Sequence, residues 1–462
     1  MNIALKDHYF KSQILGHPTG LFVLFLTEMW ERFSYYGMRA ILTLYLVTKT
    51  TDVNSGLGWS NMDALKLYGW YTMLVYLMSI PGGYIADKFI GQKKSVFIGG
   101  LILIVGHGLL AYQQMWAFYS GLALIISGVG MLKPNISTMV GGLYKVGDIR
   151  RDKGFTIFYI GINIGAFLSS LIVGYVGEKI GWHYGFGLAG IGMSLGMMVY
   201  YFGQPYLKDV GNFLGDSKSI EHKEDFHKPL TKIEKDRIIV LFISFLLVIV
   251  FWGAFEQAGG LLNLYALEKT NRVIMGMEIP ASWFQSLVAF FIIVFGTAVA
   301  RFWAVRKLKG KNASSIFKMV IGLIVMGTGF LFMSAASAQY ESQGSSAMYW
   351  LVLAYLFHTF GELSLSPVAL SFITKLAPLK YASVMMGIYF AMTGIGNKLA
   401  GLLGESASHY GEFTIFTGIA VFCILFGLIV LAFNKKIHVL THGAEDNEYI
   451  ISEKVNNKNF KL

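Results

Sequence analysis

The sequence predicts an all-α integral membrane protein with twelve transmembrane helices in two six-helix bundles. Hydrophobic residues make up 55% of the 462 residues and charged residues only 14%, whereas soluble domains carry about 25% charged residues. Twelve apolar segments follow one another, and most are long enough to cross a hydrocarbon core of ~30 Å. One polar segment divides them six and six.

The positions of the apolar segments predict the boundaries of the two bundles. The first six lie near residues 21–47, 64–86, 95–112, 116–142, 154–177 and 184–205, and the second six near 237–266, 281–300, 314–337, 346–374, 382–404 and 412–434. We therefore expect an N-terminal bundle over residues 1–206, a cytoplasmic linker over 207–236, a C-terminal bundle over 237–436 and a cytoplasmic tail over 437–462.

Lysine and arginine indicate the orientation. We call the side of the membrane that holds the N-terminus side one. If the loops alternate, side one carries 29 of the 38 Lys and Arg residues, side two carries four, and five lie within spans. An excess of Lys and Arg marks cytoplasmic loops. Both termini are thus expected in the cytoplasm of a multi-pass cell membrane protein, and the net charge of +11 does not indicate nucleic acid.

We do not expect an enzyme. The chain has one cysteine, Cys423, so it has no internal disulfide and no thiolate metal cluster. It contains no phosphate-binding glycine-rich loop and no nucleophile elbow, and we expect no metal and no cofactor. The first 20 residues are polar and mixed, so we expect no cleavable signal peptide.

Ionisable residues inside the spans are the most informative feature. They are Glu28, Glu31, Arg32, Arg39, Lys133, Glu256 and Glu362. Each would cost about 2.5–3.5 kcal/mol at the middle of a lone membrane helix, so such residues pair, face water or serve a function.

The first span concentrates them on one face. At the α-helical period, Glu28, Glu31, Arg32, Tyr35, Tyr36 and Arg39 form one stripe, which must face the protein interior or a water-filled cavity. One interpretation is an (i, i+4) pair of Glu28 with Arg32 that only stiffens the helix. The other is that two carboxylates beside one arginine take up and release a proton.

Several motifs are spread over nearly all of the chain. The most specific is the run EMWERFSYYG at 28–37. Further segments are PGGYIADKFIG at 81–91, MLKPN at 131–135, FYIGINIGA at 158–166, Trp252 with Glu256-Gln257, SWFQS at 282–286, Gly361-Glu362, and Ser366-Pro367. In this order and spacing they resemble the proton-dependent oligopeptide transporter family of the major facilitator superfamily, and the first run resembles the ExxER element of that family. The resemblance implies a symporter that imports di- and tripeptides, with protons as the coupling ion.

The resemblance also implies roles for single residues. Arg32 and Lys133 would hold the peptide carboxylate, Glu362 the amino terminus, and Glu28 or Glu31 the proton. The other substrate-binding candidates are Tyr35, Tyr36, Arg39, Tyr76, Tyr159, Asn163, Trp252, Ser366 and Tyr389. These residue types suit short peptides, which share only an ammonium and a carboxylate. Ordinary packing remains an alternative for the aromatic residues, and a structural ion pair for Lys133 and Glu362.

Gating residues follow from the same resemblance. Arg39 and Glu256, one in each bundle, would close an outer gate, and Asp87 would belong to an inner gating loop. A solvated turn is the alternative for Asp87. Two positions depart from the family pattern: Val288-Ala289 stand where Asn-Pro is usual, and Tyr389 where Trp is usual.

Two rival functions stay open. One is a transporter of the same fold for another small solute, such as nitrate or a conjugated metabolite, although a simple anion would need no acidic partner like Glu362. The other is a membrane receptor without transport. The expected partners are di- and tripeptides, protons and the lipid bilayer, and we expect the protein to function as a monomer.

Overall fold

The structure is a computed structural model that describes residues 12–145, 148, 150–213, 229–378 and 381–445. The predicted linker 207–236 and tail 437–462 therefore lie partly outside the described residues.

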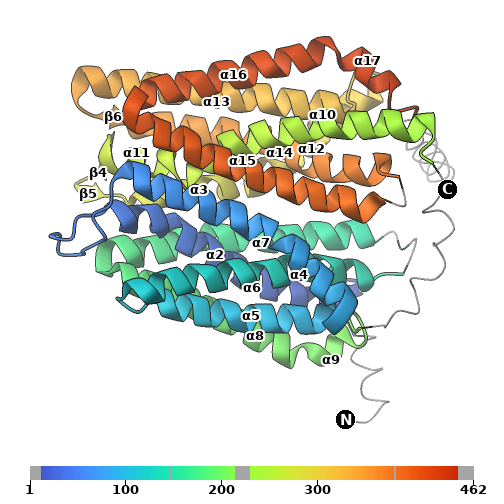
Figure 1. Cartoon of the computed structure of the whole chain (residues 1–462), viewed down its shortest axis with the longest axis horizontal. Coiled ribbons are helices and arrows are strands. Elements are labelled where there is room, and N and C mark those ends of the chain that lie inside the picture. Colours follow the sequence, from blue (N-terminus) through green and yellow to red (C-terminus); the bar gives the residue numbers. More distant parts are fainter. Residues whose placement is uncertain (1–11, 146–147, 149, 214–228, 379–380, 446–462) are drawn as a thin grey trace.

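Long helices dominate the described chain, and they form two layers (Figure 1). The first, which we call the N layer, holds α2 (Thr19–Val47), α3 (Asn61–Leu77), α4 (Ser79–Ile85), η1 (Ala86–Ile90), α5 (Gln92–Leu110), α6 (Met115–Gly142), α7 (Arg151–Tyr175), η2 (Val176–Ile180), α8 (Trp182–Phe202) and α9 (Gln204–Leu207). The second, the C layer, holds α10 (Lys232–Phe255), η5 (Glu256–Ala258), α11 (Leu261–Glu268), η6 (Ala281–Gln285), α12 (Ser286–Leu308), α13 (Ser315–Gln343), α14 (Met348–Leu376), α15 (Ala382–Tyr410), α16 (Glu412–Ala432) and α17 (Asn434–Val439).

Short strands occur only as two-residue pieces in the described residues. β1 (Gln13–Ile14) pairs with β2 (His17–Pro18), β4 (Val273–Ile274) pairs with β5 (Met277–Glu278), and both pairs are antiparallel. β3 (Thr270–Asn271) pairs in parallel with β6 (Ser346–Ala347). The predicted all-α membrane fold is confirmed.

Nine helical segments of the described chain are long and apolar enough to cross a membrane. Three predicted spans are not among them, although each is helical. α3 is 17 residues long, and α2 carries Glu28, Glu31, Arg32 and Arg39 within its 29 residues. The third is α15. The same charges that point to function thus weaken the hydrophobic signal of the first span.

Local sequence explains where the C layer begins. Thr231 and Glu234 form a capping box at the start of α10, in which each side chain bonds the backbone N–H of the other residue. Such a cap contributes about 1 kcal/mol. The first residues of the predicted tail also pack on this layer, because Ile437 is buried and the Glu445 carboxylate accepts hydrogen bonds from Ser315.

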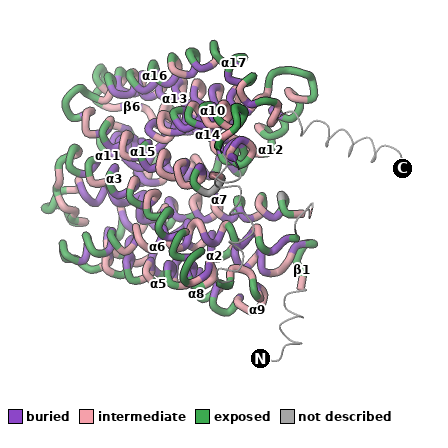
Figure 2. Tube along the Cα trace, turned by 45° about the vertical axis from the view of Figure 1, so that its right-hand side comes forward, coloured by how far each residue is buried: buried purple, intermediate pink, exposed green. Residues whose placement is uncertain are grey.

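Each layer packs within itself, and α3 and α7 of the N layer make the most extensive contacts with the C layer. In the N layer α2 packs on α7 and α8, and in the C layer α13 packs on α14 and α16. Between layers, α3 packs on α15, and α7 packs on α12 and η6. Buried residues line these contacts, while outward helix faces are exposed (Figure 2). Exposed apolar side chains such as Phe422 on α16 suit contact with lipid. The boundaries of the two predicted bundles stay a prediction.

Candidate functional site

A cavity of about 120 Å³ lies between the two layers. Nine predicted site residues line it, namely Tyr35, Tyr36, Arg39, Tyr76, Tyr159, Asn163, Trp252, Glu256 and Glu362. The sequence did not mark Ser170, Phe255, Ala258 and Ile292, and it noted Ile162, Ala166, Gln285, Val288 and Ala289 only as motif residues. A mostly apolar wall with a few convergent polar groups is typical of a small-molecule site.

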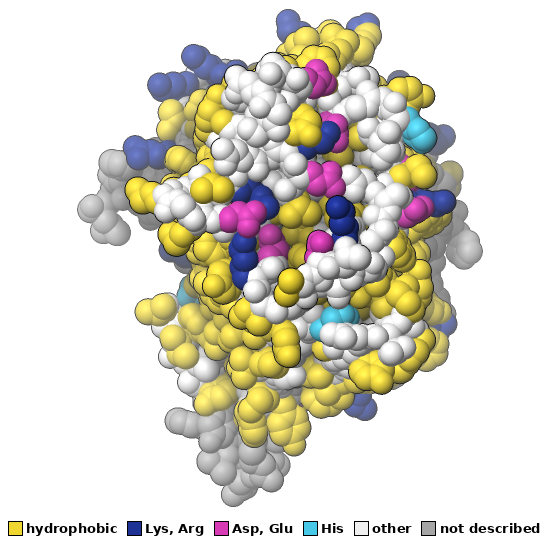
Figure 3. All heavy atoms as spheres, turned by 90° about the vertical axis from the view of Figure 1, so that its left-hand side faces the viewer, with side chains coloured by type: hydrophobic (Ala, Val, Ile, Leu, Met, Phe, Trp, Pro, Cys, Tyr) yellow, Lys and Arg dark blue, Asp and Glu magenta, His cyan; other side chains and the backbone are white. Residues whose placement is uncertain are grey.

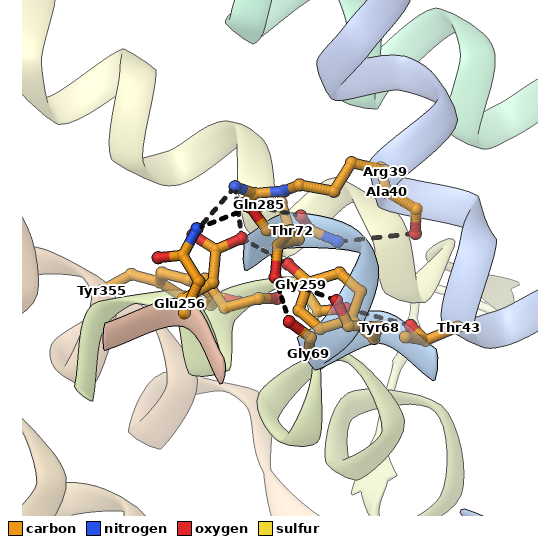
Figure 4. A network of polar contacts seen from close by, with 12 residues as sticks. Arg39, Ala40, Thr43, Tyr68, Gly69, Thr72, Glu256, Gly259, Gln285 and Tyr355 are labelled. Carbon is orange, nitrogen blue, oxygen red and sulfur yellow. Dashed lines mark hydrogen bonds and ion pairs between the residues drawn. The ribbon is translucent and has the colours of Figure 1, made fainter. Parts of the chain in front are cut away.

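An ion pair joins the layers at one end of this cavity, and Figure 4 shows the network around it. Arg39 Nη1 on α2 lies 3.1 Å from Glu256 Oε1 on η5, and both side chains are buried. Breaking a buried pair by removing one partner typically costs ~3–5 kcal/mol. The two residues therefore hold the layers together at this point.

Two further side chains complete the network, and sequence reasoning missed them. The Tyr68 hydroxyl donates to Glu256 Oε1 at 2.5 Å, and Arg39 Nη2 donates to Gln285 Oε1 at 3.3 Å. Gln285 lies in the SWFQS segment, so its motif was a usable signal. Tyr68 gave none, because only the crossing of α3 past η5 brings it to the carboxylate.

Other bonds between the layers lie at the same end. Between residues that the structure describes, they join positions 39–72 and 171–179 of the N layer to positions 256–285 and 397 of the C layer. This end is side two, where α2 ends and α3 begins. Figure 3 views its face, with charged side chains of both signs near the middle.

Tyr159 lies in the side-one half of α7 and lines the cavity, yet 40% of its surface is exposed. The hydrogen bonds between the layers, among the described residues, thus lie on side two, and an exposed cavity residue lies toward side one.

The predicted cluster on α2 forms, but it lies outside the cavity lining. Arg32 Nε is 2.8 Å from Glu28 Oε1 and 2.6 Å from Glu31 Oε2. All three side chains are at most 3% exposed. Arg32 Nη2 and Glu28 Oε2 have no hydrogen-bond partner. Because one cation faces two carboxylates, a single proton would neutralise the cluster.

Two predicted ligand-binding side chains have no ion-pair partner among the described residues. Lys133 Nζ lies 3.9 Å from the centre of the Tyr76 ring, a cation–π contact. Glu362 lines the cavity, and its Oε2 is buried without a hydrogen bond. The alternative of a structural pair between Lys133 and Glu362 is not seen. A carboxylate oxygen that is buried without a partner is costly, which favours a cationic ligand or a proton at Glu362.

Three further predicted residues are not among the residues that line the cavity. Tyr389 is buried, the Ser366 hydroxyl is buried without a partner, and Asp87 is exposed in η1. Nothing in the geometry assigns these three a ligand, so their roles stay predictions.

Comparison with known proteins identifies the family of the chain. A family model described as the POT family matches residues 93–224 and 213–415. The chain belongs to the POT family. The "Uncharacterized transporter YclF" of Bacillus subtilis is 38% identical to this POT family member, over 90% of this chain and 93% of that protein. A "Di-/tripeptide transporter" of Lactococcus lactis is 34% identical, over 91% of this chain and 96% of that protein.

A solved structure agrees with this assignment. The crystal structure of a peptide transporter POT in complex with sulfate matches this POT family member with a TM-score of 0.87 and 33% identity. The match covers 95% of this chain and 98% of that chain. The predicted family resemblance is confirmed, and the chain is a multi-pass cell membrane protein.

Proposed function

We propose that this POT family member imports di- and tripeptides across the cell membrane together with protons, by alternating access. The observation that carries the proposal is the unpaired Glu362 carboxylate in a cavity between two helix layers. A carboxylate there suits the ammonium end of a peptide. The names of the relatives support peptide as the cargo.

The two ends of a peptide would bind to opposite layers. Glu362 comes from α14 of the C layer, and Lys133 comes from α6 of the N layer. Two residues of extended chain span at most about 7 Å and three about 10 Å. Glu362 lines the cavity from one layer, while Lys133 lies against the ring of the cavity residue Tyr76 on the other. A peptide that touches both therefore needs the layers to approach, which couples binding to closure.

Proton coupling would reside in the cluster of Glu28, Glu31 and Arg32. A proton on either carboxylate weakens its hold on Arg32, which then serves the peptide carboxylate. Coupling requires that proton and peptide each favour the same state, because a ligand that binds two states equally shifts neither.

The direction of transport follows from the orientation of the loops. With side one in the cytoplasm, the structure is the inward-facing state, and the Arg39–Glu256 pair is the closed outer gate. The predicted monomeric function and the inner gating role of Asp87 belong to the same proposal.

Uptake by the purified protein in liposomes tests this function. Labelled dialanine should accumulate when the outside is acidic and should not accumulate without a proton gradient. Uptake without any dependence on the gradient would contradict symport. Nitrate that displaces dialanine fully, or no uptake at all, would favour the rival solute or a receptor.

A further inference from the structure

A second contact joins the layers on side two, apart from the Arg39–Glu256 pair. It lies where η2 at the end of α7 meets η6 at the start of α12. The Glu178 carboxylate accepts hydrogen bonds from the backbone N–H groups of Ala281 and Ser282, at 2.9 and 2.8 Å, and from Ser282 Oγ at 2.5 Å. One side chain of the N layer thus takes three donors of the C layer.

Glu178 is held firmly on its own layer. It lies in η2, a single π-helical turn of the kind often found at functional sites. Asn54 donates from Nδ2 to the carbonyl oxygen of Gly177 at 2.7 Å, and its Oδ1 accepts from the Trp182 backbone N–H at 3.2 Å. The loop after α2 therefore fixes the turn that carries the carboxylate.

The neighbouring residues fit this contact closely. Gly174 has no side chain, and a Cβ there would lie 2.2 Å from Ser282 Oγ. Trp283 Nε1 donates to the carbonyl oxygen of Leu171 at 3.0 Å. Only a glycine at 174 lets η6 approach α7 near enough for Glu178 to reach its donors.

The physical role of Glu178 is that of a helix cap supplied by the other layer. The first N–H groups of a helix lack partners within it, and a carboxylate that accepts from them is stabilising. Ordinary caps come from the same chain segment and persist in every state. This cap persists only while the layers touch on side two.

We propose that Glu178 is a second outer gating residue, whose capping of η6 stabilises the state closed on side two. This inference rests on the proposed alternating access. Loss of the cap should raise the ratio of open to closed protein on side two by about fivefold, the equivalent of ~1 kcal/mol for a lost cap.

Electron paramagnetic resonance distances between two spin labels measure that ratio. The labels go on Gln113→Cys of the N layer and Glu341→Cys of the C layer, both exposed at side two, in a Cys423→Ala background. Glu178→Ala should enlarge the population at longer distance about fivefold. The matched control is Glu412→Gln, which removes a carboxylate paired with Lys269 inside the C layer and should leave the distribution unchanged.

A double-mutant cycle adds a readout that a general loss of structure would not give. Ser282→Ala removes one donor and should shift the ratio in the same direction but less. Adding it to Glu178→Ala should change little further, because the shared contact is already gone. If Glu178→Ala does not fold, Glu178→Gln keeps the shape, weakens the charge-assisted bonds and should still shift the ratio measurably.

Three results would overturn the proposal: an unchanged distribution in a folded Glu178 variant, an equal shift in Glu412→Gln, or fully additive effects of the two substitutions. The distance measurement needs no peptide, so its outcome does not depend on whether the protein transports peptides. If the distance distribution shifts as expected but the protein takes up no dialanine, the peptide function is contradicted and the gating role of Glu178 is not.

Discussion

The crossing of α3 and α15 offers the sharpest test of how the layers close. A Cβ added at Gly401 on α15 would lie 2.7 Å from the Cα of Gly69 and 3.0 Å from the carbonyl oxygen of Leu65, both on α3. These are backbone atoms, which cannot rotate away. Gly401→Ala should therefore push the two layers apart on side two.

The size of the effect follows from these distances. Ordinary contact begins at 3.4 Å, so a Cβ at 2.7 Å requires the helices to separate by about 0.7 Å. Overpacking of this kind typically costs ~1–3 kcal/mol. If the cost falls on the closed state alone, the ratio of open to closed protein rises about 5- to 150-fold.

The assay is the distance between the labels on Gln113→Cys and Glu341→Cys, measured without peptide. Gly387→Ala on the same helix is the control, because a Cβ there meets no atom within 4 Å. Both substitutions gain the same helix propensity, about 1 kcal/mol. A folded Gly401→Ala protein with the wild-type distribution, or an equal shift in Gly387→Ala, would refute the reasoning.

Three further predictions concern the ligand, the proton and the outer surface. Glu362→Gln should weaken binding of dialanine more than binding of N-acetyl-dialanine in a competition assay, because only the first has an ammonium; equal losses would remove Glu362 from the site. Glu28→Gln or Glu31→Gln should abolish accumulation against a gradient yet spare peptide counterflow, and a double variant that still accumulates dialanine under a pH gradient would place the proton elsewhere. On side two, the hydrogen bond from Lys179 lowers the pKa of Glu278 below its ordinary value of 4.5. This link between the layers therefore persists above that pH and weakens only as the pH falls through the lowered pKa. Lowering the pH from 7 to 5.5 should change the label distances equally in Glu278→Gln and in the parent protein, and a pH response of the parent that vanishes in Glu278→Gln would contradict this.

Sequence alone determined the features that depend on neighbours along the chain. The lengths and spacing of the apolar segments predicted the membrane helices, because a span needs a fixed number of residues. The helical period predicted that Glu28 and Arg32 share a face, and the structure has them 2.8 Å apart. Motifs spread over the chain predicted the family and, through it, half of the cavity residues.

The tertiary structure decided which distant residues meet. Arg39 and Glu256 were expected as a gate from the family resemblance, but only the packing of the layers adds Tyr68 and Gln285. It also leaves Glu362 without a partner and brings Glu178 to η6. These contacts join residues more than a hundred positions apart, and local periodicity carries no information on such approaches. They depend on how the two layers of helices pack against each other, which residues that are neighbours along the chain do not specify.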